Sequence, residues 1–214
     1  KAESIFKNRS EFCDYILEKQ DKSVIYRLVM IIAISGGIYG FTMGLYNSPL
    51  QALVSAIKVP LLFLVTLSIC LPTLHFLGLL MGYKFKLLQS LSILLWGIAV
   101  TCLLMGAFAP ISLFFLLSNS TYQFIMSMHI MFFSVSGLAG LVYVFRNFNQ
   151  LKSHAEFTGD VGNNPVLAIW TLLYMFVGTQ MAFILSPYVG PISGFVLFTS
   201  ENKNFYSYLF GLIF

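Results

Sequence analysis

The stretch SAIKVPLLFLVTLSICLPTLHF, residues 55–76, decides the class of fold. After Lys58 it contains no charged residue, and leucine, isoleucine, valine and phenylalanine dominate it. A helix crosses the hydrocarbon core of a bilayer with about 20 mostly apolar residues. Because the bilayer core offers no water to pair with the backbone, such a run must satisfy its hydrogen bonds as a helix. The stretch therefore predicts a transmembrane helix.

The rest of the chain repeats this pattern. Of its 214 residues, 58% are hydrophobic and 9% are charged, whereas a typical soluble domain has about 25% charged residues. Long segments have no charged residue at all: those between Arg27 and Lys58, Lys86 and Arg146, and Asp160 and Glu201. The period-two alternation of a transmembrane barrel is absent. We therefore predict an all-α integral membrane protein with about five transmembrane helices plus interfacial helices.

The predicted spans cover residues 24–46, 59–81, 87–108, 122–145 and 166–185. They form one five-helix transmembrane domain, residues 24–187, between an N-terminal cytoplasmic or interfacial amphipathic segment (1–23) and an interfacial or re-entrant C-terminal segment (188–214). The apolar pieces 111–117 and 204–214 are too short to cross as helices. Because the numbering begins at a lysine, the sequence leaves open whether the true N-terminus is present.

Residues 49–58 are predicted to form a separate short helix that lies flat on the membrane. Ser48 and Pro49 match a helix start, a capping residue followed by a proline in the first turn. Gln51, Ser55 and Lys58 share the face opposite the leucines, which suggests that the Lys58 ammonium group is an interfacial anchor in water. The alternative is that Lys58 binds an anion or a lipid headgroup. Pro60 would then begin the second span.

Pro72 lies in the middle of the second span. It cannot donate a hydrogen bond to the carbonyl of Ser68, and its ring pushes that turn open, so we expect a kink. Kinks of this kind are usually structural. The functional alternative is a hinge or a pore at the kink, with His75 near the path.

Small residues recur at every fourth position on two of the spans. Gly36, Gly40 and Gly44 share one face of the first span, and a second set on the fifth span consists of Gly178, Ala182 and Ser186. Small residues at this spacing let a neighbouring helix approach closely in lipid. Both faces are predicted to be helix-packing faces, within the protein or between copies.

The inventory of reactive side chains in the spans is short. No Asp or Glu lies between Asp21 and Glu156, although proton- and cation-coupled transporters commonly place carboxylates in the membrane. Of the two span histidines, His75 and His129, neither belongs to an HExxH motif. The three cysteines form no CxxC pair and are read as apolar fillers. We therefore predict no catalytic residue, no metal site and no cofactor, and we expect that the protein is not an enzyme.

The positions of the basic residues predict the orientation of the chain. All but Lys58 and Lys203 of the 12 Lys and Arg residues fall in the N-terminal segment, at the start of the first span (Arg27), or in the loops after the second and fourth spans. Cytoplasmic loops carry the excess of Lys and Arg. We therefore predict a multi-pass membrane location with the N-terminus in the cytoplasm and the C-terminus outside. Because the net charge of +4 is spread along loop ends, it indicates no nucleic-acid partner.

Three stretches carry a resemblance to known proteins: SPLQALVSAIKVPLLFLVTLSICLPTL (48–74), FVGTQMAFILSPYVGP (176–191) and NFY (204–206). They resemble an uncharacterised family of bacterial polytopic membrane proteins, some of which carry an actin-binding label. That family favours Arg where this chain has Ser186. The order of spans is also similar to that of the Yip family of five-span trafficking proteins, whose Asp-Leu-Tyr-Gly-Pro signature is missing. Neither resemblance implies an activity.

These observations favour a non-catalytic membrane subunit. It would be a scaffold or accessory component whose partners are membrane lipid, further copies of itself or the other subunits of a membrane complex. The alternative is a channel or transport component with a pore near the Pro72 kink, and an intramembrane enzyme comes third.

Overall fold

The computed structural model describes residues 22–80, 87–118, 121–154 and 165–189. Within these residues the fold consists of helices only, and five of them are long and apolar enough to cross a membrane. They are α3 (Lys22–Gly44), α4 (Pro49–Leu80), α5 (Leu87–Leu117), α6 (Tyr122–His154) and α7 (Pro165–Leu185). The predicted all-α class and the predicted number of spans are therefore confirmed. Of the two predicted interfacial segments, 1–23 and 188–214, residues 1–21 and 190–214 lie outside the described residues, and residues 22–23 belong to α3.

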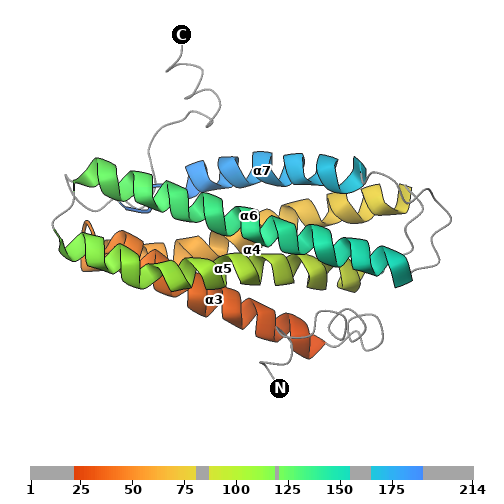
Figure 1. The fold of residues 1–214 in the computed structure, drawn as a ribbon, viewed down its shortest axis with the longest axis horizontal. Helices are drawn as coiled ribbons and strands as arrows, with labels where there is room; N and C mark the ends of the chain where they lie inside the picture. The colour runs from red at the N-terminus through yellow and green to blue at the C-terminus, as the bar shows by residue number, and fades with distance from the viewer. Residues whose placement is uncertain (1–21, 81–86, 119–120, 155–164, 190–214) are drawn as a thin grey trace, which may run out of the picture.

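Consecutive helices run in opposite directions, as short connections between spans require (Figure 1). The α3–α4 turn, the α5–α6 turn and the C-terminal end of α7 consequently lie at the same end of the molecule, on the left in Figure 1. We call it the Ser48 end, after a residue of the α3–α4 turn. Orientation relative to the two sides of the membrane stays a prediction.

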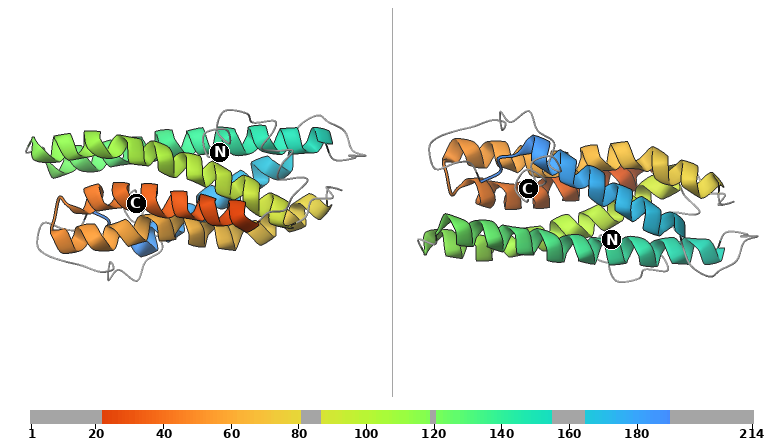
Figure 2. Two further views of the ribbon diagram at one scale, coloured as in Figure 1. Left: turned by 90° about the horizontal axis from the view of Figure 1, so that it is seen from below. Right: turned by 90° about the horizontal axis from the view of Figure 1, so that it is seen from above.

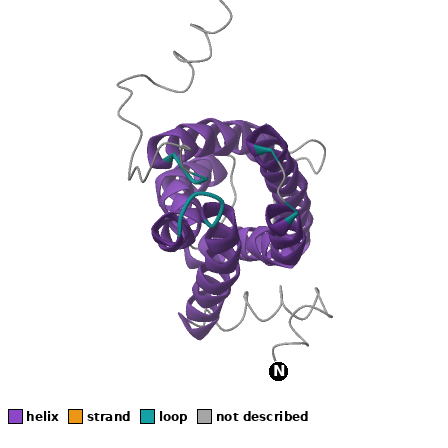
Figure 3. Cartoon of the chain, turned by 90° about the vertical axis from the view of Figure 1, so that its left-hand side faces the viewer, coloured by secondary structure: helices purple, strands orange, loops and turns teal. Residues whose placement is uncertain are grey.

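The helices form two layers. Figure 2 shows α5 beside α6 in one layer and α3 beside α4 in the other, with α7 lying along α4. The layers meet where α5 packs against α3, and α4 touches α5 less extensively. In the end view of Figure 3 the helices surround the bundle axis, and α3 projects on one side.

The helix that contains Lys58 differs from its prediction. Residues 49–58 are not a separate helix on the membrane surface, because α4 runs without interruption from Pro49 to Leu80 and contains both Pro60 and Pro72. Pro60 removes only the bond to the carbonyl of Ala56. Proline is tolerated inside transmembrane helices because neighbouring helices compensate for the lost bond. Here α3 packs along this part of α4, and its Gly36 lies against the Pro60 ring.

The predicted helix end near Pro110 is also wrong. Residues 111–117 are not a separate piece, because α5 continues through Pro110 to Leu117. Likewise α6 continues past the predicted end of the fourth span, residue 145, as far as His154. In both cases the helix is longer than the apolar stretch that crosses the membrane, because a helix can extend beyond the hydrocarbon core.

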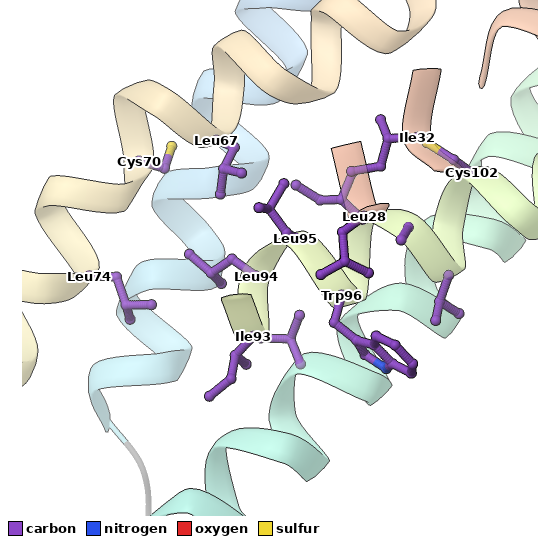
Figure 4. Close-up of a cluster of buried hydrophobic side chains, with 14 of the residues drawn as sticks. Leu28, Ile32, Leu67, Cys70, Leu74, Ile93, Leu94, Leu95, Trp96 and Cys102 are labelled. Carbon is purple, nitrogen blue, oxygen red and sulfur yellow. The ribbon is translucent and has the colours of Figure 1, made fainter. Parts of the chain in front are cut away.

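The first half of α5 is the centre of the bundle. Every residue from Ser92 to Cys102 is buried, so this segment is covered on all its sides. A helix that is apolar all round is expected to be enclosed in this way. Its side chains join those of α3 and α4 in the larger core cluster, where Leu28, Leu67 and Leu94 lie (Figure 4).

A second core cluster lies toward the Ser48 end and is rich in aromatic and sulfur-containing side chains. Its buried members include Tyr39 of α3, Val59 of α4, Met105 of α5 and Phe132 of α6. The rings of Phe108 and Phe132 stack with their centroids 4.5 Å apart. This cluster connects the two layers where α3 and α6 have little other contact.

Candidate functional site

The glycines predicted to form a packing face on the first span lie against α4. A Cβ atom at Gly44 would be 2.6 Å from the Cα of Ala52, and one at Gly36 would be 3.3 Å from the Pro60 ring. At Gly40 a Cβ would overlap the carbonyl oxygen of Ser55. The stripe therefore forms a close contact between two helices of the same chain, and it is not available to a second copy.

A second close helix contact joins α5 and α6. A Cβ at Gly140 would be 2.7 Å from the carbonyl oxygen of Gly97 and would overlap the Thr101 hydroxyl. The Thr101 hydroxyl itself donates to the Gly97 carbonyl at 3.1 Å. Sequence reasoning missed this contact, although small residues also lie four positions apart here: Gly97 and Thr101 on α5, and Ser136 and Gly140 on α6.

The small residues of α7 make a looser contact. A Cβ at Gly178 would be 3.7 Å from the Thr66 methyl group of α4, an ordinary van der Waals distance. Ala182 and Ser186 are both partly buried. A more specific link, which sequence reasoning missed, is the indole N–H of Trp170, which donates to the Cys70 carbonyl at 2.9 Å. Trp170 thereby fixes α7 against α4.

The predicted water-facing position of Lys58 is wrong. Its side chain is only 4% exposed, and Gln51 and Ser55 on the same face of α4 are fully buried. The leucines that were expected to enter the membrane surface occupy the outward face instead, since Leu50 and Leu53 are exposed. The polar face therefore points into the protein. We call Gln51, Ser55 and Lys58 the polar row.

The polar row binds main-chain carbonyl groups of the segment that follows α7. The Gln51 amide N–H donates to the Pro187 carbonyl at 3.0 Å, and the Ser55 hydroxyl donates to the Tyr188 carbonyl. The Lys58 ammonium lies 3.4 Å from the same Pro187 oxygen. In each contact a donor on α4 meets a carbonyl oxygen that lies beyond the last residue of α7, Leu185. The polar row thus satisfies groups at the end of α7 that would otherwise be buried unpaired.

The position of Lys58 also has an electrostatic reason. The C-terminal end of a helix carries a partial negative charge, which a nearby cation stabilises. α7 ends at Leu185, and the ammonium group lies two residues beyond, at the Pro187 carbonyl. A buried charge is costly in a membrane domain unless polar groups surround it. The Pro187 carbonyl, just beyond the end of α7, is one of these polar groups.

Two side-chain atoms of the residues that make these contacts have no hydrogen-bond partner in the structure. They are the amide oxygen of Gln51 and the phenolic oxygen of Tyr188, and both are buried. Burial raises the pKa of the Tyr188 phenol above its usual value, so this group stays neutral. Leaving a buried polar group unpaired costs about 1–3 kcal/mol. Of the polar row, Gln51 is therefore only partly satisfied by the end of α7.

A buried pair of polar side chains links the two layers of the bundle. The Tyr39 hydroxyl of α3 and Nδ1 of His129 on α6 are 2.7 Å apart, and the two rings meet edge to face. Tyr39 is fully buried and His129 is 2% exposed. A hydrogen bond between helices is the expected role for a histidine in a span. Tyr39 was not singled out from the sequence, where nothing distinguishes it from the other tyrosines.

The two residues of the pore alternative, Pro72 and His75, lie three positions apart on α4. The Pro72 ring is exposed on α4, and His75 is partly buried near the opposite end from the polar row. The His75 ring has Phe76 as a neighbour, with centroids 6.5 Å apart. Among the described residues, no group of three or more His, Cys, Asp or Glu side chains could hold a metal ion.

Comparison of the chain with protein-family models, with curated proteins and with solved structures finds no match. The resemblance to the bacterial polytopic membrane family therefore stays a prediction.

Proposed function

We propose that the protein is a non-catalytic, multi-pass membrane subunit, a scaffold or accessory component that packs against partner helices, itself or lipid. The observation that carries this proposal is the sparse cover of α7. This helix packs against α4 and presents a broad outward apolar face. The exposed large side chains of that face are Ile169, Leu172, Leu173, Met175, Phe176 and Ile184.

Apolar exposure alone does not make a partner surface in a membrane, because lipid tails are as apolar as leucine. Association there depends on close packing, and α6 offers a place for it. A Cβ at Gly137 would meet no atom within 4 Å, so the surface is shallow at this glycine. Leu138 and Val142 lie exposed on the same helix. The outer faces of α6 and α7 are therefore the proposed partner surface.

The side-chain inventory supports a role without chemistry. The spans contain no Asp or Glu, and paired carboxylates are a common basis for acid–base catalysis. The buried polar groups are accounted for mainly by contacts between elements of the chain, such as Tyr39 with His129 and Ser55 with Tyr188.

Crosslinking from inside the membrane tests the proposal. A photo-reactive residue at Leu172 on α7 is compared with one at Ile34, which is 57% exposed on α3. After irradiation in native membranes, the protein is purified in mild detergent and the masses of its crosslinked products are measured. We expect a protein adduct from Leu172 and lipid adducts alone from Ile34. Lipid adducts alone at both positions, with a particle mass of one chain, would refute the subunit proposal.

The alternative, a transport component, has a specific structural requirement. Pro72 is exposed on the outer surface of the isolated chain. A path past Pro72 would therefore have to lie between copies of the protein. A homo-oligomer whose Leu172 adduct is a second copy, together with ion flux into liposomes that Pro72→Ala changes, would favour this alternative over an accessory subunit.

A further inference from the structure

The end of the α5–α6 hairpin carries an exposed apolar patch. It consists of the last turns of α5 and the first turn of α6. Phe115 joins the two helices, because its ring centroid lies 5.5 Å from that of Phe114 and 5.1 Å from that of Phe124. The exposed large apolar side chains of the patch are Ile111, Leu113, Phe114, Leu117 and Phe124. We call it the hairpin tip, and in both views of Figure 2 it projects beyond the α3–α4 turn.

The length of α5 means that lipid tails cannot cover all of its apolar surface. Its 31 residues correspond to about 46 Å along a helix, whereas the hydrocarbon core is about 30 Å thick. A tilt of about 50° would be needed to place the whole helix within it, and transmembrane helices tilt by about 0–40°. The two most exposed large apolar side chains of α5, Phe114 and Leu117, both lie at the Ser48 end. The hairpin tip is therefore the part of α5 that gains most from a cover of protein.

The chain that follows α7 continues from a point close to the hairpin tip. Val189 is fully buried in the second core cluster, whose members also include Ala109 of α5 and Ile125 of α6. The polar row binds the main-chain carbonyl groups of the two preceding residues, Pro187 and Tyr188. These contacts fix the place from which the rest of the chain begins.

The sequence beyond Val189 provides an apolar segment within reach of the hairpin tip. Residues 192–198 read ISGFVLF. Measured from the shared cluster, Leu117 lies eight residues beyond Ala109 on α5, which is about 12 Å along a helix. Phe198 lies nine residues beyond Val189, and nine residues span about 14 Å as a helix or about 30 Å when extended. The segment is long enough in either conformation.

We propose that residues 192–198 pack against the hairpin tip of the same chain and cover Phe114, Leu117 and Phe124. The tether favours this occupant over a free partner, because a short linker gives an effective concentration of the order of millimolar. The polar row acquires a role in this arrangement, since it holds the start of the covering segment. The contact goes beyond the proposed subunit role and does not depend on a protein partner.

Photo-crosslinking from the hairpin tip tests the contact. A photo-reactive phenylalanine derivative replaces Phe114, and in the control it replaces Phe176 on α7, which is also exposed. Chains with light and with heavy isotopes are mixed in detergent and reconstituted into liposomes before irradiation. The crosslinked peptides are then identified by mass. We expect position 114 to crosslink to a peptide from residues 190–214 of the same chain, and position 176 not to do so.

A charge in the covering segment provides the second measurement. Phe198→Asp should lower the yield of this crosslink to half or less, because burying a charge in an apolar contact is costly. Ser200→Asp adds the same charge just beyond the segment and should leave the yield unchanged.

Four results would overturn the proposal. Lipid adducts alone from position 114 would show that lipid covers the hairpin tip, and a crosslink between a light and a heavy chain would show that a second copy does. Equal crosslinking of residues 190–214 from positions 114 and 176 would show that the contact is not specific. An unchanged yield in Phe198→Asp would show that the segment does not bury its apolar side chains there.

Discussion

Gly40→Ala is the sharpest test of how the first two spans pack. The added Cβ would overlap the carbonyl oxygen of Ser55 and lie 2.9 Å from its carbonyl carbon and 3.1 Å from the Cα of Ala56. All three are main-chain atoms, so no side chain can rotate away. The helices α3 and α4 must move apart, and the contact between them is lost over several turns.

The magnitude follows from two opposing effects. Overpacking a well-packed contact costs about 1–3 kcal/mol. Replacing glycine by alanine in a helix contributes about 1 kcal/mol in the other direction. The net destabilisation expected for Gly40→Ala is therefore between about 0 and 2 kcal/mol. By itself this range is too wide to be decisive.

Gly137→Ala on α6 removes the ambiguity. It introduces the same methyl group in a helix, but at a position where nothing lies within 4 Å of the new atom. It should therefore stabilise the protein by up to about 1 kcal/mol. Because both variants share the gain in helix propensity, the difference between them isolates the packing term, which is about 1–3 kcal/mol.

The assay is reversible unfolding in mixed detergent micelles, followed by helical signal and by tryptophan fluorescence. The free energies of unfolding of the two variants are compared with each other rather than with the wild type alone. If Gly40→Ala and Gly137→Ala have equal free energies of unfolding, the glycine stripe does not contact α4 and the reasoning fails. Gly40→Leu should enlarge the effect, and Ile38→Leu, off the stripe, should not.

Three further predictions concern polar contacts and topology. In a double-mutant cycle of unfolding free energies, Tyr39→Phe and His129→Leu should show a coupling of about 0.6 kcal/mol and no more than about 1.7 kcal/mol. Zero coupling would mean that the hydrogen bond contributes nothing. Lys58→Arg should lower the melting temperature of the protein, because the larger guanidinium group has no room at a position that is 4% exposed. An unchanged melting temperature would support the interfacial-anchor interpretation instead. Ser118 and Ser153 lie before and after the transmembrane part of α6. Single cysteines at these positions should react with a membrane-impermeant thiol reagent from opposite sides of the membrane. Labelling from the same side would contradict the five-span topology.

The number and positions of the spans could be read from the sequence, because they depend on a local property. A segment crosses the bilayer when its own residues are apolar over sufficient length, whatever its neighbours are. The same locality explains the glycine stripe, since Gly36, Gly40 and Gly44 share a face in any helix. It also explains the capped start of α4, where the Gln51 N–H donates to the Ser48 hydroxyl at 3.1 Å.

The helix ends could not be read in the same way. Pro60 and Pro110 are strong local signals for a helix start or end, yet both lie inside α4 and α5. A proline costs the helix one hydrogen bond, and in lipid the alternative is a break that exposes several backbone groups. Packing against neighbouring helices therefore decides the outcome, and the sequence of one helix contains no information about its neighbour.

The contacts of the polar row likewise divide into what the sequence determines and what only the tertiary structure decides. The sequence by itself determined that Gln51, Ser55 and Lys58 share one face of a helix, because that follows from a period of 3.6 residues. Only the tertiary structure decided that this face meets the carbonyls of Pro187 and Tyr188 rather than water. Amphipathic periodicity identifies a polar face but not what lies opposite it. The partner groups are main-chain atoms more than 120 residues away in the chain, and main-chain carbonyls are present at every position of any sequence.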